Sequence, residues 1–210
     1  MAIYNKFIYQ PRPKNMIESN DLSSYDDGSM ISQIKSNGSN CVLSTNGKDH
    51  RVMNRHGQRL TNFQLTDDEI KSIYRGNGGW VVINAEYLNK NKLGDNNIPF
   101  NHKLIIFDIL VYDDDYLVGR TFEDRILLLD ELYGKIDSEK EYLYKISDNV
   151  YRVKSYESEF KALFDKYTPI DFVEGLVLKR KKAKLEVSSG PENNWRSQVK
   201  CRKPTKNYRY

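Results

Sequence analysis

Apolar and polar positions alternate or run together along much of the chain in patterns typical of β-strands. Residues 31–45 predict two strands joined by a Ser-Asn-Gly turn. Apolar runs at 80–88 and 103–112, the second interrupted only by Asp108, predict buried strands. Shorter strands are expected at 142–146, 150–153, 175–180, 184–187 and 196–201.

Helical spacing of apolar residues appears between these strands. Residues 121–133 predict a helix that ends at Gly134, and residues 155–167 predict another that Pro169 stops. The sequence Thr-Asp-Asp-Glu at 66–69 is a capping box and predicts a short helix running to Gly76. Strands at both ends with helices between them predict an α+β fold with largely antiparallel sheets and flanking helices.

The domain organisation follows from length and from the opening segment. Residues 1–30 are polar and predict a loop-rich lead-in, followed by one domain over 31–210 with a basic C-terminal segment. No apolar run approaches the ~18–20 residues of a membrane helix. The N-terminus lacks a signal-peptide pattern, and two cysteines make no disulfide framework. These features predict a cytoplasmic protein without a membrane partner.

The formal net charge of +4 conceals an asymmetry between two parts of the chain. From Lys179 onward, eleven Lys and Arg accompany two Glu, so this segment carries +9, whereas the preceding residues carry −5. A dense cationic end on an acidic body is typical of a protein that binds a polyanion, although a solvated basic tail has the same composition.

Five charged residues interrupt segments that otherwise favour burial. Burying a charge is costly unless it is paired, so these residues predict either a shared polar cleft or strands with one wet face. They are Glu86, Asp108, Glu174, Lys179 and Lys200. Lys35, at the end of a strand and beside a turn, is a candidate nucleophile because a lysine near other cations loses its proton more readily.

The spacing of these residues resembles that of the covalent nucleotidyltransferases, in particular the ATP-dependent polynucleotide ligases. The sequence K-x-N-G at Lys35 resembles the family's nucleophile motif, and E-G-L-V-L-K from Glu174 resembles its later signature. Four shorter matches lie in the expected order: Arg55-His-Gly57, Ala85-Glu86, Phe107-Asp108 and Val199-Lys200-Cys-Arg202. The resemblance covers residues 31–203. It implies an ATP-grasp-like adenylation domain in a minimal form like that of phages.

The resemblance implies roles for individual positions. Lys35 would attack the α-phosphate of ATP and carry AMP, while Lys179 and Lys200 would neutralise that phosphate as further catalytic residues. Glu174 and Glu86 would hold Mg²⁺ or Mn²⁺. Nucleotide contacts would come from Gln33 (base edge), Phe107 (stacking), Glu86 (ribose), Arg55 (sugar or phosphate), Asn40, Lys179, Lys200 and Arg202. The implied partner is a nicked DNA or RNA duplex, gripped by Lys181, Lys182, Arg196, Lys203 and Lys206.

Some positions depart from the family pattern and leave alternatives open. Asn40 stands where DNA ligases usually have Arg and resembles one branch of RNA ligases, whereas Arg55-His-Gly57 and the Phe122-x-x-Arg125 helix start resemble DNA ligases. Ten residues follow Lys200, so an OB-fold domain is not expected here, and a partner supplying one is an alternative. Two rival functions are open. One is a capping-type guanylyltransferase. The other is a nucleic-acid-binding or virion protein with the ligase fold but no turnover.

Overall fold

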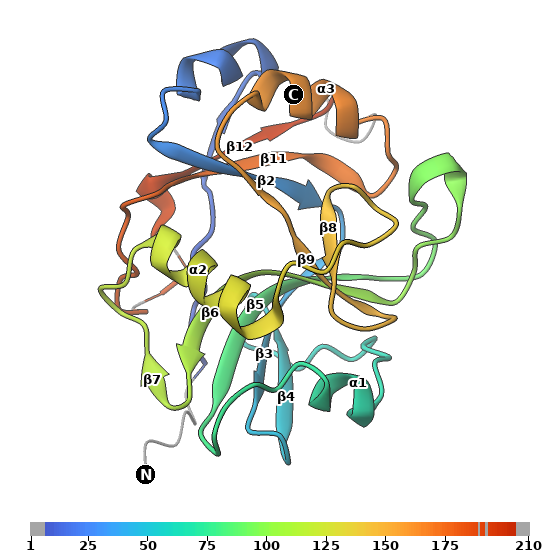
Figure 1. Cartoon of the computed structure of the whole chain (residues 1–210), viewed down its shortest axis with the longest axis vertical. Coiled ribbons are helices and arrows are strands. Elements are labelled where there is room, and N and C mark those ends of the chain that lie inside the picture. Colours follow the sequence, from blue (N-terminus) through green and yellow to red (C-terminus); the bar gives the residue numbers. More distant parts are fainter. Residues whose placement is uncertain (1–6, 189, 192, 205–210) are drawn as a thin grey trace.

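Two β-sheets form the framework of the protein (Figure 1). The computed structural model describes residues 7–188, 190–191 and 193–204. The first sheet has the strand order β1 (Asn15–Ile17), β12 (Gln198–Arg202), β11 (Val173–Arg180), β2 (Met30–Ser36) and β10 (Ser155–Tyr156). The second has the order β4 (His50–Asn54), β3 (Ser39–Thr45), β5 (Val81–Leu88), β6 (Lys103–Tyr112), β9 (Val150–Val153) and β8 (Leu143–Lys145), with β7 (Asp115–Tyr116) paired to β6.

Helical segments lie between the strands and against the sheets. The α-helices are α1 (Asp67–Lys71), α2 (Phe122–Tyr133) and α3 (Phe160–Tyr167), and the 3₁₀ helices are η1 (Ser19–Tyr25), η2 (Asp95–Asn97) and η3 (Trp195–Ser197). The predicted α+β class is confirmed. Both sheets are mixed, however, because β1 pairs with β12 and β6 pairs with β9 in parallel, while the other strand pairs are antiparallel. No helix within the described ranges is long and apolar enough to cross a membrane.

Strands β2 and β3 are consecutive in the chain but belong to different sheets. The turn between them passes close to β5, where a Cβ on Gly38 would lie 2.4 Å from the Tyr87 carbonyl oxygen. Only glycine allows this approach. The Asn37 N–H donates to the Phe172 carbonyl oxygen at 2.7 Å and ties the turn to the segment before β11. The predicted turn is therefore the junction of the two sheets.

Alternation along the first sheet separates an apolar face from a polar face. On β2 and β11, Ile34, Leu176 and Leu178 are buried in one apolar cluster with residues of α3, such as Phe160 and Phe164. Because side chains alternate across a strand, the positions between them face the other way. Gln33 and Lys35 of β2 and Lys179 of β11 occupy these intervening positions, toward the second sheet. Glu174 instead lies at an irregularity in the pairing of β11 with β2, between Val173 and Gly175.

Helix α2 covers the second sheet on the left of Figure 1. Phe122, Ile126 and Leu129 are buried in the same apolar cluster as residues of β5 and β6, which is the helical spacing that the sequence predicts. Thr121 and Asp124 form a reciprocal capping box at its start, and Gly134 follows its last residue with a φ of 67°. The predicted helix is therefore confirmed at both ends.

Several predicted boundaries are wrong. The expected lead-in contains β1 and η1, because its apolar residue Leu22 is fully buried against the first sheet. Residues 155–156 form β10 rather than the start of a helix, since they pair with β2, and α3 begins at Phe160. The capping box of α1 is confirmed, but the helix ends at Lys71.

The predicted strand at 184–187 is absent. Backbone bonds here run to the loop before α2: the Leu185 N–H donates to the Arg120 carbonyl oxygen at 2.8 Å, and the Gly119 N–H donates to the Leu185 carbonyl oxygen at 2.9 Å. The side chain of Asn194 bonds the backbone of Lys184 and Glu186 at 2.8 and 2.9 Å. A side chain thus takes the place of a neighbouring strand.

Candidate active site

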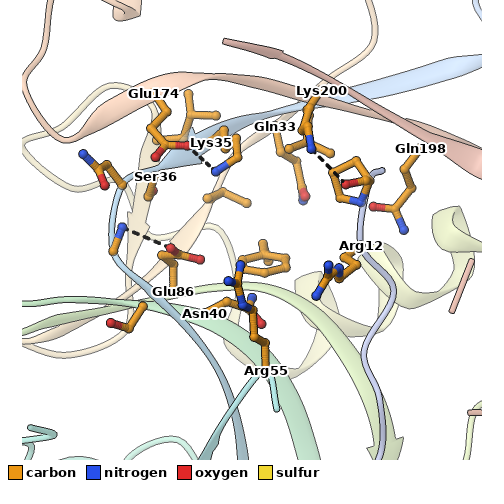
Figure 2. Close-up of a pocket in the computed structure, with 18 of the residues that line it drawn as sticks. Arg12, Gln33, Lys35, Ser36, Asn40, Arg55, Glu86, Glu174, Gln198 and Lys200 are labelled. Atoms are coloured by element: carbon orange, nitrogen blue, oxygen red, sulfur yellow. Dashed lines mark hydrogen bonds and ion pairs between the residues drawn. The ribbon is translucent and has the colours of Figure 1, made fainter. Parts of the chain in front are cut away.

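A cavity of about 590 Å³ lies between the two sheets, at the junction made by β2 and β3. Its size is within the range of small-molecule binding sites. Figure 2 shows that charged side chains enter it from opposite sides. Six Lys or Arg side chains and two Glu side chains line it, which gives a formal net charge of +4. The cavity is therefore suited to a polyanion.

Strand register explains which residues of the first sheet reach this cavity. One row of paired residues across β2, β11 and β12 consists of Gln33, Val177 and Lys200. Two residues further along β2, the row consists of Lys35, Gly175 and Arg202. Lys179 of β11 pairs with Gln198 of β12, two residues from the Val177–Lys200 pair in the opposite direction. The strand positions therefore alternate between this cavity and the core beneath α3, and motifs more than 130 residues apart in the chain lie side by side.

Lys35 and Glu174 form an ion pair at one end of the cavity (Figure 2). The carboxylate also lies 3.4 Å from the Arg202 Nε. Lys35 and Glu174 keep only 18% and 21% of their side-chain surface exposed. Gly175, beside Glu174, has a φ of +151°, and a Cβ there would lie 1.9 Å from the Cys201 carbonyl oxygen. The glycine of the E-G-L-V-L-K motif is therefore required by the packing of β11 against β12.

Glu86 enters the cavity from the second sheet, below Lys35 in Figure 2. Its Oε1 accepts the Gly38 N–H at 3.0 Å, so the carboxylate also holds the turn after Lys35. Burial raises the pKa of Glu86 to about 7, although the nearby Lys35 and the Gly38 hydrogen bond oppose this shift. Glu86 therefore changes its charge close to neutral pH, which makes it a functional candidate.

Lys179 is buried and lies between two aromatic rings. Its Nζ is 4.9 Å from the centre of the Phe107 ring and 4.5 Å from that of Phe122, and it donates to the Gln33 Oε1 at 2.8 Å. Burial lowers the pKa of Lys179 to about 8; Asp108 opposes this shift and Arg125 adds to it. The ammonium group is thus held in place by cation–π and amide contacts.

The remaining predicted nucleotide contacts also line the cavity. Gln33 uses both ends of its amide, because its Nε2 donates to the Ser155 Oγ at 3.1 Å. Asn40 donates to Asn84 Oδ1 at 3.1 Å and accepts from Gln10. Arg55 is exposed, and its Nε donates to His56 at 3.0 Å. Burial, together with Arg202 and Lys35, lowers the pKa of Lys200.

Asp108 does not join the shared cleft that the sequence predicts for it. It is 2% exposed and accepts two hydrogen bonds from Arg125 of α2, at 2.8 and 3.0 Å. The cost of burying the carboxylate is offset by this bidentate pair. The other four interrupting charges, Glu86, Glu174, Lys179 and Lys200, do line one cavity.

Four of the residues predicted to grip a polynucleotide are described by the structure, and all four lie outside the cavity lining. Lys181 pairs with Glu157 at 2.6 Å, Lys182 pairs with Glu123, and Arg196 lies 5.2 Å from the centre of the Trp195 ring. Lys203 donates to the carbonyl oxygens of Thr168 and Ile170 at 2.8 and 2.9 Å, after the end of α3. Lys206 lies outside the described residues.

Sequence reasoning missed Arg12 and Gln198, which both line the cavity. Gln198 belongs to the same strand as Lys200 at even spacing, and this alternation could have identified it. Arg12 lies in the segment predicted to be a lead-in, where only the prolines on either side marked a stiff backbone.

The lining residues fit a nucleotide with a metal better than a metal alone. Within the described parts of the chain, no cluster of three or more His, Cys, Asp and Glu side chains is placed to hold an ion. Glu86 and Glu174 supply the carboxylate oxygens of the cavity. Mg²⁺ is commonly held by one or two carboxylates together with substrate phosphates and water, so this donor set fits a metal that arrives with a phosphate ligand.

The raised pKa of Glu86 predicts a specific dependence of stability on pH. Between pH 4.5 and about 7 the folded protein binds a proton at Glu86 that the unfolded chain releases, so this group's contribution to the free energy of unfolding falls as the pH rises. Glu86→Gln removes this contribution. We expect the stability of the variant relative to wild type to increase between pH 5 and pH 8, measured by urea unfolding. A difference that stays constant between these pH values would contradict the assignment.

Comparison with known proteins gives a match at the level of the fold. No protein-family model and no curated protein matches the chain. Mycobacterial DNA ligase D, solved in complex with ATP and MES, matches with a TM-score of 0.65 and 14% identity over 92% of this chain and 60% of that chain. The ligase domain of LigD from M. tuberculosis matches with a TM-score of 0.62 and 15% identity over 91% of this chain and 60% of that chain.

An archaeal ATP-dependent RNA ligase matches with a TM-score of 0.51 and 14% identity over 92% of this chain and 48% of that chain. The chain therefore spans about 60% of the length of the first two ligase structures. At these identities the likeness concerns the fold. The resemblance read from the motifs is confirmed to this extent: the chain has the fold found in ATP-dependent DNA and RNA ligases.

Proposed function

We propose that this protein is an ATP-dependent polynucleotide ligase that seals nicks through a lysyl–AMP intermediate. The observation that carries the proposal is Lys35, paired with Glu174 in a cavity of net charge +4. The DNA ligase D that shares this fold was solved in complex with ATP. A lysine nucleophile, a polyanion-binding cavity and this fold together support nucleotidyl transfer to Lys35.

The cavity supplies a complementary group for each part of ATP. The Phe107 ring offers a stacking face to the adenine, and the free lone pair and N–H of the Gln33 amide can bond its edge. In the proposed complex Glu86 binds the ribose hydroxyls, and Arg55 binds the sugar or a phosphate. Lys179, Lys200 and Arg202 balance the charge of the α-phosphate, which is the main requirement of phosphoryl transfer.

In the first step the Lys35 Nζ attacks the α-phosphorus of ATP. An ammonium group cannot attack, so one proton leaves first, and Glu174 is the adjacent base that can accept it. The nitrogen–phosphorus bond forms as the bond from the α-phosphorus to the bridging oxygen breaks, and pyrophosphate leaves with that electron pair. The second proton is lost from the nitrogen. A divalent metal held by Glu86 and Glu174 would supply further charge neutralisation.

The later steps use the same residues. The 5′-phosphate of a nick attacks the phosphorus of lysyl–AMP, the nitrogen–phosphorus bond breaks, and Lys35 recovers its proton. The 3′-hydroxyl then loses its proton to water and attacks the phosphorus of the activated 5′-phosphate. The bond from that phosphorus to the bridging oxygen breaks, and AMP leaves with the electron pair as the new phosphodiester forms. The AMP phosphorus reacts in the first two steps and the phosphorus of the strand's 5′-phosphate in the third. The two phosphorus atoms are joined by one bridging oxygen, so Lys179 and Lys200 would balance the phosphate charge in each step.

A labelling experiment distinguishes the ligase from its rivals. Incubation with α-³²P-labelled ATP and Mg²⁺ is expected to label the protein covalently, with release of pyrophosphate. Labelling by GTP instead of ATP would indicate a capping-type guanylyltransferase. Absence of label with either nucleotide, under several metals and pH values, together with salt-sensitive binding to nicked duplex, would indicate a binding protein without turnover.

The polynucleotide substrate is tested by end joining. Three matched nicked duplexes are compared: DNA, RNA, and a hybrid with one strand of each. We expect the protein to seal at least one of them in an ATP-dependent reaction. The preferred duplex identifies the partner nucleic acid. Covalent labelling without sealing of any duplex would contradict the ligase proposal, unless an added OB-type domain protein restored it. A duplex with a 5′-hydroxyl at the nick is the matched negative control.

A further inference from the structure

Arg12 lies at the exposed rim of the cavity, between two prolines. Proline fixes its own φ near −65°, and the residue before a proline is restricted to extended conformations. The Pro-Arg-Pro sequence therefore stiffens the backbone on both sides of the arginine. A cation on such a backbone loses less conformational freedom when it binds a ligand than one on a flexible tail.

Tertiary contacts hold this segment against the cavity wall. Gln10 donates to Asn40 of β3, the Arg12 N–H donates to the Asn193 carbonyl oxygen at 3.3 Å, and Asn193 donates to the Tyr9 carbonyl oxygen at 2.8 Å. The Nζ of Lys200 lies 3.5 Å from the Pro13 carbonyl oxygen. The position of Arg12 is thus set by parts of the chain that lie up to 188 residues away.

Charges are distributed unevenly between the two ends of the cavity. At the end with Lys35, the carboxylate of Glu174 is shared with Arg202. Arg12 and Lys200 lie at the opposite end in Figure 2, and among the described residues no carboxylate forms an ion pair with either of them. The positive charge of Arg12 contributes to lowering the pKa of Lys200. Glu174 opposes this shift, but its effect is smaller than that of each of the cations Arg202, Lys35 and Arg12, so the two cations at this end are not offset by a paired carboxylate.

We propose that Arg12 is a phosphate-binding residue of the cavity, acting beside Lys200 on a phosphate other than the one that Lys35 attacks. A guanidinium group suits this role because its fork of N–H donors matches two phosphate oxygens. The inference rests on the proposed ligase function. In that reaction two sources supply such a phosphate: the β- and γ-phosphates of ATP, which must leave from the side opposite Lys35 in an in-line displacement, and the 5′-phosphate of the nick.

The test compares Arg12→Gln with Lys14→Gln, a charge-removing control two residues away that lies outside the cavity lining. The donor arm measures the affinity of α,β-methylene-ATP, which cannot transfer AMP, against that of AMP. The strand arm measures binding to nicked duplexes with a 5′-phosphate or a 5′-hydroxyl. Loss of a charge-assisted contact costs about tenfold in affinity or more.

If the donor phosphates are the ligand, Arg12→Gln weakens α,β-methylene-ATP about tenfold and leaves AMP unchanged. If the 5′-phosphate of the nick is the ligand, Arg12→Gln binds nicked duplexes with a 5′-phosphate and with a 5′-hydroxyl equally well. Arg12→Lys keeps the positive charge without the forked N–H donors of the guanidinium, so we expect it to lose less affinity than Arg12→Gln in either measurement. Equal affinities of Arg12→Gln and Lys14→Gln in both arms, or no binding of any probe by the wild-type protein, would overturn the proposal.

The two proposals fail in distinguishable ways. Both binding arms work without turnover, so a weaker α,β-methylene-ATP complex in Arg12→Gln supports the phosphate site even when the wild-type protein takes no label from ATP. Conversely, a labelled wild-type protein whose probe affinities do not depend on Arg12 keeps the ligase function and loses the role of Arg12. Because Arg12 is exposed, the melting temperature of each variant should stay close to that of wild type.

Discussion

Lys35→Ala is expected to abolish covalent labelling by α-³²P-labelled ATP, a loss of at least roughly 10³-fold. In the proposed reaction the Nζ of Lys35 is the nucleophile, and the neighbouring lysines Lys179 and Lys200 are held by other contacts. Lys35→Arg should lose the label equally, because a guanidinium keeps the charge but is not deprotonated in proteins. The measurement is label retained on the protein after denaturation.

Controls separate the loss of the nucleophile from the loss of a lysine or of folding. Lys181→Ala removes a lysine that pairs with Glu157 outside the cavity, and it should label like wild type. A nicked duplex already adenylylated at its 5′-phosphate bypasses Lys35, so Lys35→Ala should still seal it in the absence of ATP. Label that persists in Lys35→Ala at more than a tenth of the wild-type level would show that another residue carries AMP.

Asp108→Ala is expected to lower the free energy of unfolding by about 3–5 kcal/mol, the usual cost of leaving one buried charge without its partner. Asp108 and Arg125 are 2% and 4% exposed, so water cannot replace the lost contact. The change also reaches the cavity, because Asp108 opposes the lowering of the Lys179 pKa. Without Asp108 a smaller fraction of Lys179 stays protonated, and nucleotide binding should weaken near pH 8. Urea unfolding and titration with ATP measure the two effects.

Two comparisons identify the cause of this destabilisation. Replacing both partners, with Asp108→Leu and Arg125→Met, removes the unpaired charge and should recover most of the lost stability. Glu123→Ala breaks an ion pair with Lys182, whose side chain is 80% exposed, and it should change the stability by less than about 1 kcal/mol. A cost below about 1 kcal/mol for Asp108→Ala would mean that the buried pair does not stabilise the fold.

Local patterns along the chain sufficed to predict those elements whose formation depends on near neighbours. The strands β2, β5 and β11, the capping box of α1 and the Ser-Asn-Gly turn were all predicted, because each depends on contacts within a few residues. The predicted strand at 184–187 was wrong because a distant side chain, Asn194, bonds its backbone instead of a neighbouring strand.

In the candidate site, too, local patterns predicted some residues and long-range contacts decided others. Motif spacing identified Lys35, Glu86, Glu174, Lys179 and Lys200. Alternation decides which positions of a strand share a face, except at Glu174, which lies at a register shift of β11. Spacing could not distinguish Asp108 from these residues, because the partner that withdraws it from the cavity is Arg125 on α2. Nor could it identify Arg12, whose place depends on contacts with Asn193 and Pro13.

The amino-acid sequence thus specified the strands, their polar faces and the identity of the charged residues, since these follow from short-range sterics and from the period of two in a β-strand. Tertiary structure decided which charges meet. Pairing of β11 with β2 on one side and with β12 on the other brought Lys35, Glu174 and Arg202 together, and packing of the N-terminal segment added Arg12. These outcomes depend on register and long-range burial, to which residues throughout the chain contribute at once.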